Sequence, residues 1–357
     1  MAEPAPGAPG ATPARPRRRR RSATQTVTLT DVARLAGVSS QTVSRTLRTP
    51  TEVSDETRAR VESAVRESGY VPNLTARGLA SNSSKLVATI IPSISTSIFA
   101  ETLDAATEVL STSGYELVLG INGYDTVREE QLVRNLLGRR PDGVLLVGVR
   151  HTEATVAMLQ ASGLPVVETW EWTSSPIDAL VGFSNRDAMA DLTRALVERG
   201  YRRPVFVGSQ REGDDRSRQR FEGFAEQHRR SFGDAEPRFV DASALPLTLG
   251  SGARLLAEAR SAHPDADLLV FATDILAAGA LLAAEREGLR VPDDVAISGF
   301  GDFELAAAVT PALTTVSVPA ARLGEIAASH LLERIATAEA SPAQVDVGYE
   351  VVLRASA

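Results

Sequence analysis

The chain has 357 residues, 43% of them hydrophobic and 23% charged, values that are typical of soluble globular proteins with more than one domain. It contains no cysteine, which excludes disulfides and thiolate metal sites, and its four histidines lack metal-ligand spacing, so we expect no metal and no cofactor. No apolar run approaches the ~20 residues that a membrane-spanning helix needs, and the N-terminus lacks the apolar core of a secretory signal. We therefore expect a cytoplasmic protein with no membrane partner.

The net charge of −7 is distributed unevenly along the chain. From Arg15 to Lys85 there are 14 Lys and Arg against 6 Asp and Glu, whereas from Leu86 to Ala357 there are 24 against 38. A basic end on an acidic body is expected when one end contacts a polyanion, although a basic tail that binds nothing specific would have the same charge. Residues 1–26 include the five arginines Arg17–Arg21 and are predicted to be a disordered arm, which adds either phosphate contacts or only solubility.

Residues 27–71 have the pattern of a helix-turn-helix domain. Thr30 is predicted to cap a first helix, whose apolar face is Val32, Ala33, Leu35 and Ala36. Gly37-Val38-Ser39 is a turn into a second helix, with Val43 and Leu47 directed inward. Ser54 is predicted to cap a third helix, Asp55–Ser68, which ends at Gly69. Residues 72–84 follow as a linker with a short hinge helix that begins after Asn73.

From Lys85 onward, apolar strands alternate with amphipathic helices, which indicates parallel sheets covered on both faces. The first set of strands is Leu86–Ile91, Tyr115–Leu119, Val144–Val147 and Pro165–Val167, followed by a bridging strand at Ala179–Phe183. The second set is Pro204–Val207, Arg238–Val240, Leu268–Phe271 and Val295–Gly299. The tail, with Leu313–Val318, a helix at Ala320–Ala336 and a strand at Val345–Leu353, is expected to return to the first set.

The predicted fold is therefore an all-α helix-turn-helix head with a hinge helix, followed by an α/β body of two doubly wound parallel-sheet lobes, residues 85–357. We call the lobes the first lobe (about 85–183 and 314–357) and the second lobe (about 184–313).

The second helix of the head has the side chains that a recognition helix needs. Such a helix enters the major groove of DNA and presents short polar side chains near its N-terminus, which here are Ser39, Ser40, Gln41, Thr42, Ser44 and Arg45. A glutamine can pair bidentately with adenine, and an arginine with guanine. The head is therefore predicted to read base edges of double-stranded DNA.

Three motifs resemble those of the LacI/GalR family of bacterial repressors: Val27–Arg45, Val53–Arg58 and Tyr70–Ala80. The resemblance extends from Thr28 nearly to the C-terminus. It implies a homodimer, or a higher oligomer, on a pseudo-palindromic operator, so that the protein would be nucleoid-associated when bound. It also implies a body similar to periplasmic sugar-binding proteins, with a small-molecule effector between its lobes.

The resemblance also assigns roles to residues of the hinge. Leu79 would be wedged between base pairs of the minor groove, or else would pack one hinge helix on another. With the hinge residues and Thr28 included, the expected DNA-contacting set is Thr28, Ser39, Ser40, Gln41, Thr42, Ser44, Arg45, Asn73, Ala76, Arg77 and Leu79.

Candidate effector residues follow from the rule that ligands bind beyond the carboxyl ends of the strands of such sheets. The set is Ser93, Ser95, Phe99, Tyr124, Arg150, Glu171, Asn185, Arg216, Arg220 and Asp274, with Ser97, Asn122, Trp172 and Arg211 beside them. Arg216 and Arg220 share one helix face and suit an anion. The resemblance places Arg220 at a ligand-binding arginine. Gly301 departs from the family, where many members have an aspartate; Asp302 either substitutes for that aspartate or does not.

Several stretches resemble the gluconate-utilisation repressor branch of this family, among them Ile91–Ser93, Phe99–Glu101, His151-Thr152 and Leu164–Glu168. Together with the paired arginines, this predicts a repressor of carbohydrate or sugar-acid genes whose effector is a sugar or a gluconate-like sugar acid. The ligand would either lower or raise the affinity for DNA.

Two other classes of protein compete with a regulator. A periplasmic-type sugar-binding protein is disfavoured by the head and by the lack of a signal peptide. An enzyme on a doubly wound fold is disfavoured because the chain has no GxSxG, no P-loop and no GxGxxG opening a helix, so we expect no catalytic residues.

Overall fold

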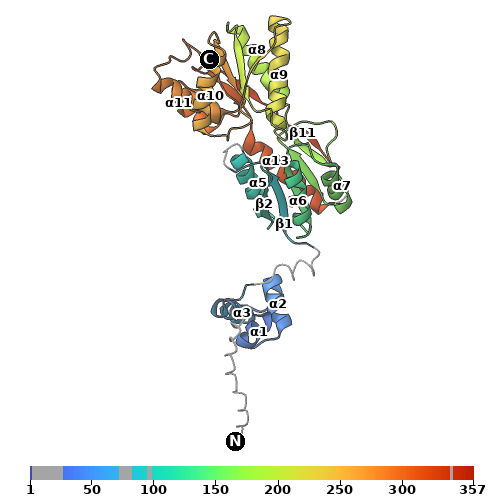
Figure 1. The fold of residues 1–357 in the computed structure, drawn as a ribbon. Coiled ribbons are helices and arrows are strands. Elements are labelled where there is room, and N and C mark those ends of the chain that lie inside the picture. Colours follow the sequence, from blue (N-terminus) through green and yellow to red (C-terminus); the bar gives the residue numbers. More distant parts are fainter. Residues whose placement is uncertain (2–26, 72–82, 95–98, 338–340) are drawn as a thin grey trace. The chain divides into compact units, whose positions relative to one another are not determined.

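The computed structural model describes Met1 and residues 27–71, 83–94, 99–337 and 341–357. The chain divides into two units, Met1–Arg77 and Gly78–Ala357, which we describe separately (Figure 1). Several sequence-based expectations lie outside the described residues: the arm before Val27, the hinge helix with Asn73, Ala76, Arg77 and Leu79, and the loop residues Ser95 and Ser97. None of the helices in the described ranges is long and apolar enough to cross a membrane.

The head consists of α1 (Leu29–Ala36), α2 (Ser40–Arg48), a 3-10 turn η1 (Pro50–Glu52) that was not anticipated, and α3 (Asp55–Ser68). Its core centres on Val32, Val43 and Val61, one from each α-helix and each fully buried. Ser54 caps α3 and Gly69 ends it in the left-handed conformation, as predicted.

Two details of the predicted first helix are wrong. Thr30 does not cap α1; Thr28 does, because its side chain accepts from the Asp31 amide while the Asp31 carboxylate accepts from the Thr28 amide, a reciprocal capping box. Leu35 does not belong to the inward face, since it is 51% exposed. The buried residues of α1 are Val32, Ala33 and Ala36.

In the body, the first sheet has the strand order β11-β5-β4-β3-β1-β2, and every pairing in it is parallel. Its strands are β1 (Leu86–Ile91), β2 (Glu116–Ile121), β3 (Gly143–Val147), β4 (Val166–Thr169), β5 (Ala179–Gly182) and β11 (Gln344–Asp346). The helices that accompany it are α5 (Ala100–Thr112), α6 (Thr126–Leu137), α7 (Glu153–Ser162) and α13 (Ala320–Ala336). Alternate residues of β1 and β3 face opposite ways: Val87 and Leu145 pack with α5 and α13, whereas Ala88 and Val144 pack with α6 and α7.

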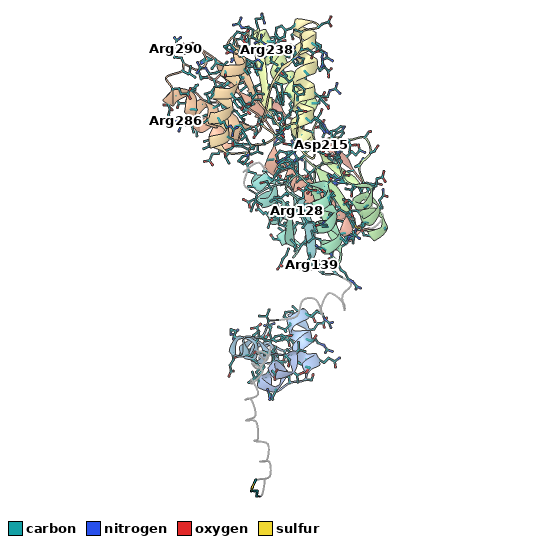
Figure 2. The ribbon with its side chains drawn as sticks, in the orientation of Figure 1. Arg128, Arg139, Asp215, Arg238, Arg286 and Arg290 are labelled. Atoms are coloured by element: carbon teal, nitrogen blue, oxygen red, sulfur yellow. The ribbon has the colours of Figure 1, made fainter. Side chains whose placement is uncertain are left out.

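The second sheet is also parallel, in the order β7-β6-β8-β9. Its strands are β6 (Pro204–Gly208), β7 (Arg238–Asp241), β8 (Leu268–Phe271) and β9 (Ala296–Ser298). Helices α8 (Asn185–Glu198) and α9 (Asp215–Phe232) cover one face, and α10 (Leu249–Ala262) and α11 (Asp274–Arg286) cover the other, with a short α12 (Glu304–Ala308) that the sequence pattern did not reveal (Figure 1). Figure 2 shows Arg238 of β7 in this lobe, well away from Asp215 at the start of α9.

The chain passes between the lobes three times. It enters the second lobe between β5 and α8, and returns through β10 (Thr315–Ser317) to α13. It leaves the first sheet again after β11 through β12 (Glu350–Val352), which pairs antiparallel with β10. The predicted single strand Val345–Leu353 is therefore two short strands. The tail also does not stay in the first lobe, because the Ser356 hydroxyl bridges Ile297 and Thr314 beside the second sheet.

Candidate DNA-reading helix and effector pocket

The N-terminal end of α2 is organised by its own hydroxyl groups. The Ser39 side chain caps the helix by accepting from the Thr42 amide at 3.0 Å, and it also bonds the Thr42 hydroxyl at 2.8 Å. Gln41, Ser44 and Arg45 are exposed, and within the described ranges no hydrogen bond or ion pair engages their side chains. Ser39 and Thr42 therefore hold the helix end, while Gln41, Ser44 and Arg45 present their polar groups to solvent.

The turn before α2 is held from α3. Gly37 lies in the left-handed region, with φ of 63°. The Arg60 guanidinium of α3 donates to the Ala36 carbonyl, at 2.6 and 3.1 Å, and to the Gly37 carbonyl at 3.0 Å. These carbonyls at the end of α1 would otherwise lack partners within the helix, so Arg60 both caps α1 and fixes the direction in which α2 leaves it.

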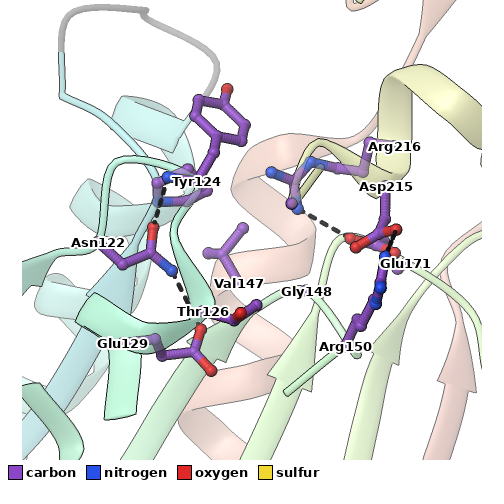
Figure 3. A pocket seen from close by; sticks show the side chains of 12 residues that line it. Asn122, Tyr124, Thr126, Glu129, Val147, Gly148, Arg150, Glu171, Asp215 and Arg216 are labelled. Carbon is purple, nitrogen blue, oxygen red and sulfur yellow. Dashed lines mark hydrogen bonds and ion pairs between the residues drawn. The ribbon is translucent and has the colours of Figure 1, made fainter. Parts of the chain in front are cut away.

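A pocket in the body collects side chains that follow several strands (Figure 3). Four of the predicted effector residues line it: Tyr124, Arg150, Glu171 and Arg216. Asn122 also lines it, and so do Glu129, Gly148, Gly213 and Asp215, which sequence reasoning did not nominate. The first-lobe residues come from the loops after β1, β2, β3 and β4, from the end of β3 and from the first turns of α6, and the second-lobe residues come from the start of α9 and the loop before it.

Two ion pairs cross this pocket from one lobe to the other. The Arg216 guanidinium donates to the Glu171 carboxylate at 2.9 Å, and the Arg150 guanidinium donates to Asp215 at 3.1 Å. The first pair is nearly fully buried, with side chains 7% and 3% exposed, whereas Arg150 is 48% exposed. The Arg216 guanidinium also lies over the rings of Phe99 and Tyr124, at 5.4 and 5.8 Å from their centroids.

Burial and charge set the protonation of this group. Burial raises the pKa of the Glu171 carboxyl, although the Arg216 charge opposes the rise. Burial, the largest single effect, opposes the charge of Arg216, but the charges of Glu171, Tyr124 and Asp214 and the hydrogen bond of Tyr124 together outweigh it, so the pKa of Arg216 is raised. Burial also raises the pKa of the Tyr124 hydroxyl. The pocket therefore holds a protonated arginine whose charge is matched by a protein carboxylate.

Arg220 and Asn185 lie beside the pocket rather than in its lining. Arg220 donates to the Asn185 side chain at 2.9 Å and to the Ala272 carbonyl at 2.6 Å, and it stacks on Phe300 at 3.7 Å. Its Nη2 atom is buried without a hydrogen-bond partner in the described part of the chain. Burial and the Arg216 charge lower the pKa of Arg220 to about 10. A buried cation with an unused donor suits a ligand that accepts hydrogen bonds.

Asp274 and Ser93, both predicted effector residues, are not among the residues that line the pocket. The Asp274 carboxylate accepts from the Thr315 hydroxyl at 2.6 Å and from the Phe303 amide at 3.1 Å, and burial raises its pKa to about 6. Asp302, next to Gly301, pairs with Arg354 at 2.6 Å and is not among the residues that line the pocket. Gly301 has φ of 130°, a conformation that L side chains rarely adopt.

Sequence reasoning missed two further features beside the pocket. Gln219 donates to Glu171 at 2.9 Å, and nothing in the sequence marked Gln219 as a pocket residue.

His151 lies buried between Glu129, at 2.5 Å, and Glu168, at 3.3 Å. The other Glu129 oxygen accepts from Asn122, whose own oxygen accepts from the Tyr124 amide, so this buried triad supports the pocket wall. Within the described residues there is no cluster of His, Asp and Glu suited to a metal ion.

Comparison with known proteins identifies both units. Residues 28–73 match the model of bacterial regulatory proteins of the lacI family, and residues 193–357 match that of a periplasmic binding protein-like domain. The chain is 37% identical over 329 residues to the HTH-type transcriptional regulator GntR of Pseudomonas aeruginosa, covering 92% of this chain and 95% of the relative.

Solved structures agree with these matches. A LacI-family transcriptional regulator from Silicibacter pomeroyi matches with a TM-score of 0.86 and 36% identity, covering 92% of this chain and 99% of that chain. The lac repressor dimer bound to operator and the anti-inducer ONPF matches with a TM-score of 0.76 and 25% identity, covering 93% and 99%. The predicted fold class is confirmed, and so is the prediction of a DNA-binding regulator rather than an enzyme. The chain belongs to the LacI family of bacterial transcriptional regulators.

Proposed function

We propose that this regulator represses genes of sugar-acid utilisation and that its body binds a gluconate-like sugar acid as effector. It acts in the cytoplasm, at the nucleoid, as a homodimer on a pseudo-palindromic operator. The observation that carries the effector class is the pair of buried arginines at the pocket, Arg216 and Arg220, the second of which has a buried donor without a partner. A carboxylate is the ligand group that best matches the planar fork of an arginine.

The remainder of the pocket suits a polyol chain. Asn122 and Asp215 provide an amide and a carboxylate group, and Tyr124 provides an aromatic face with a hydroxyl. Such side chains accept from and donate to the hydroxyls of a sugar, while the arginines distinguish an acid from a neutral sugar. The pocket thus has separate groups for the two ends of an aldonate.

On the DNA side, we assign base reading to Gln41 and Arg45, because their side chains are exposed at α2 and have no partner in the described part of the head. Ser40 and Ser44 accompany them. The dimer and the operator are supported by the likeness to the lac repressor dimer bound to operator. Leu79 of the hinge, with Asn73, Ala76 and Arg77, is assigned to the minor groove on the basis of the sequence motif.

The effector class is tested by thermal shift and calorimetry with gluconate, glucose and glucitol. We expect gluconate to raise the melting temperature and to change the affinity for operator, with little effect of the two neutral compounds. Arg220→Gln should abolish the gluconate shift. The matched control Arg238→Gln removes an arginine of β7 that pairs with Asp265, and this variant should retain the shift. Stabilisation by the neutral compounds alone would refute the sugar-acid assignment.

The operator assignment is tested by gel shift with the full chain. Gln41→Ala should cost about 1–3 kcal/mol of binding to the preferred operator and relax the sequence preference. Leu79→Ala should weaken operator binding while the unfolding of the body stays the same. Unchanged operator affinity in the Leu79 variant would assign that side chain to some role other than the wedge.

A further inference from the structure

The buried ion pair at the pocket has the geometry of a carboxylate bound by a dedicated receptor. One Glu171 oxygen accepts from Arg216 at 2.9 Å and the other accepts from Gln219 at 2.9 Å. These two donors lie three residues apart on α9, so they share one face of that helix. Glu171 itself follows β4 in the other lobe. The second lobe thus grips a carboxylate that the first lobe supplies.

The surroundings of this pair leave little space for a second anion. Gly148 lies against it: a Cβ at this position would be 3.3 Å from the Glu171 carboxylate and 3.5 Å from the Arg216 guanidinium. Phe99 and Tyr124 cover the guanidinium, and Gly213 approaches the Tyr124 carbonyl so closely that a Cβ there would be 2.0 Å from it. Two carboxylates on one buried arginine would repel each other strongly.

We propose that Glu171 occupies the carboxylate position of the effector pocket, so that a sugar acid binds Arg216 and Gln219 only by displacing it. This inference rests on the proposed effector class. Glu171 then determines which ligands act. A neutral polyol has no group that competes with the Glu171 carboxylate for the Arg216 guanidinium. A sugar acid does, and when it binds, the ion pair between Glu171 and Arg216 is replaced by an ion pair between the ligand and Arg216.

The displacement has a consequence for signalling. While Glu171 holds Arg216, the lobes are joined at this point by the protein itself. When a ligand carboxylate takes Arg216, the Glu171 side chain is released and the first lobe must contact the second through the hydroxyls of the ligand. The same exchange therefore sets the threshold concentration of the effector and changes the contact between the lobes.

The test compares the affinity for gluconate of the wild type, Glu171→Gln and Glu171→Asp by titration calorimetry. Removing the competing charge should tighten gluconate binding on the order of tenfold or more in Glu171→Gln, because a neutral amide oxygen holds the Arg216 guanidinium less strongly than a carboxylate does. Glu171→Asp keeps the charge on a shorter side chain and should show a smaller gain; it carries the test if Glu171→Gln does not fold. The matched control is Glu198→Gln, an exposed residue at the end of α8, which should bind as the wild type does.

The outcomes separate this inference from the proposed effector class. Tighter gluconate binding in the Glu171 variants, with glucitol still bound weakly or not at all, supports the inference. Weaker gluconate binding in both variants would show that Glu171 contacts the ligand itself, which overturns the inference and leaves the effector class in place. An equal gain for glucitol and gluconate also overturns it. Failure of the wild type and of both variants to bind any sugar acid overturns the effector class and the inference together.

Discussion

The buried triad of Glu129, His151 and Glu168 makes the stability of the body depend on pH in a predictable direction. The His151 side chain is 1% exposed, and the side chains of Glu129 and Glu168 on either side of it are 3% and 1% exposed. Burial alone would lower the pKa of the imidazole, but the hydrogen bonds and charges of the two glutamates outweigh it and raise the pKa to about 9. The folded protein therefore holds a proton on His151 that the unfolded chain releases near its ordinary pKa of 6.5.

The magnitude follows from the same two values. Because the folded state binds this proton more tightly, the contribution is fully present below about pH 6.5 and is lost as the pH rises through about 9. With each pKa unit worth about 1.4 kcal/mol, the imidazolium contributes about 3 kcal/mol to the free energy of unfolding. We expect the body to lose about that amount between pH 6.5 and 9.5.

The assay is urea unfolding followed by tryptophan fluorescence. Both tryptophans of the chain, Trp170 and Trp172, lie in the body, so their emission reports this unit and not the head. His151→Gln should lower stability at pH 6.5 and flatten the decline toward pH 9.5. His263→Gln, at the end of α10 and outside the triad, should retain the wild-type decline. Parallel declines in the wild type and His151→Gln would refute the role given to the imidazolium.

Three further predictions concern the head and the pocket. Arg60→Ala should lower the melting temperature of the head and weaken operator binding, because the Arg60 guanidinium holds carbonyl groups of the turn before α2. The salt dependence of operator binding should stay the same. If binding titrations show that the slope of log affinity against log salt falls by about one counterion, Arg60 contacts a DNA phosphate instead. Thr28→Ala removes the capping box and should cost about 1 kcal/mol of head stability in calorimetry of the full chain; an unchanged head transition would show that the cap is not needed. Gly213→Ala forces a Cβ against the Tyr124 carbonyl at φ of 88°, so it should destabilise the body and weaken effector binding; a wild-type unfolding midpoint by fluorescence would contradict the tight approach.

Much of the fold was predictable because most of the longer helices and strands follow from local pattern. The buried strand Leu86–Ile91 was predicted with its observed bounds, since its apolar β-branched run has a single interpretation in a parallel sheet. The sequence pattern assigned the N-cap of α1 to Thr30 and not to Thr28, because both residues are threonines. Only Thr28 stands three residues before Asp31, which is the spacing of a capping box. The division of the tail into β11 and β12 was not predictable, since it depends on the pairing with β5 and β10.

The pocket was predictable in outline and not in its pairings. Tyr124, Arg150 and Glu171 each follow a strand of the first sheet, so the topology alone places them at one edge. Which carboxylate each arginine takes depends on how two lobes meet, which no local pattern encodes. For the same reason His151 passed unnoticed as a pocket support: its partners Glu129 and Glu168 lie 22 and 17 residues away in the sequence.

The three passages of the chain between the lobes limit how such a protein can be recombined. A chimaera that borrows the second lobe of a relative must exchange the long central segment and the last few residues together, because Ser356 is bonded beside the second sheet. A single crossover between β5 and α8 would instead place β11 and α13 of one protein against the first sheet of another. New effector specificity in this architecture is therefore expected to arise by point substitution around the pocket more readily than by shuffling of whole lobes.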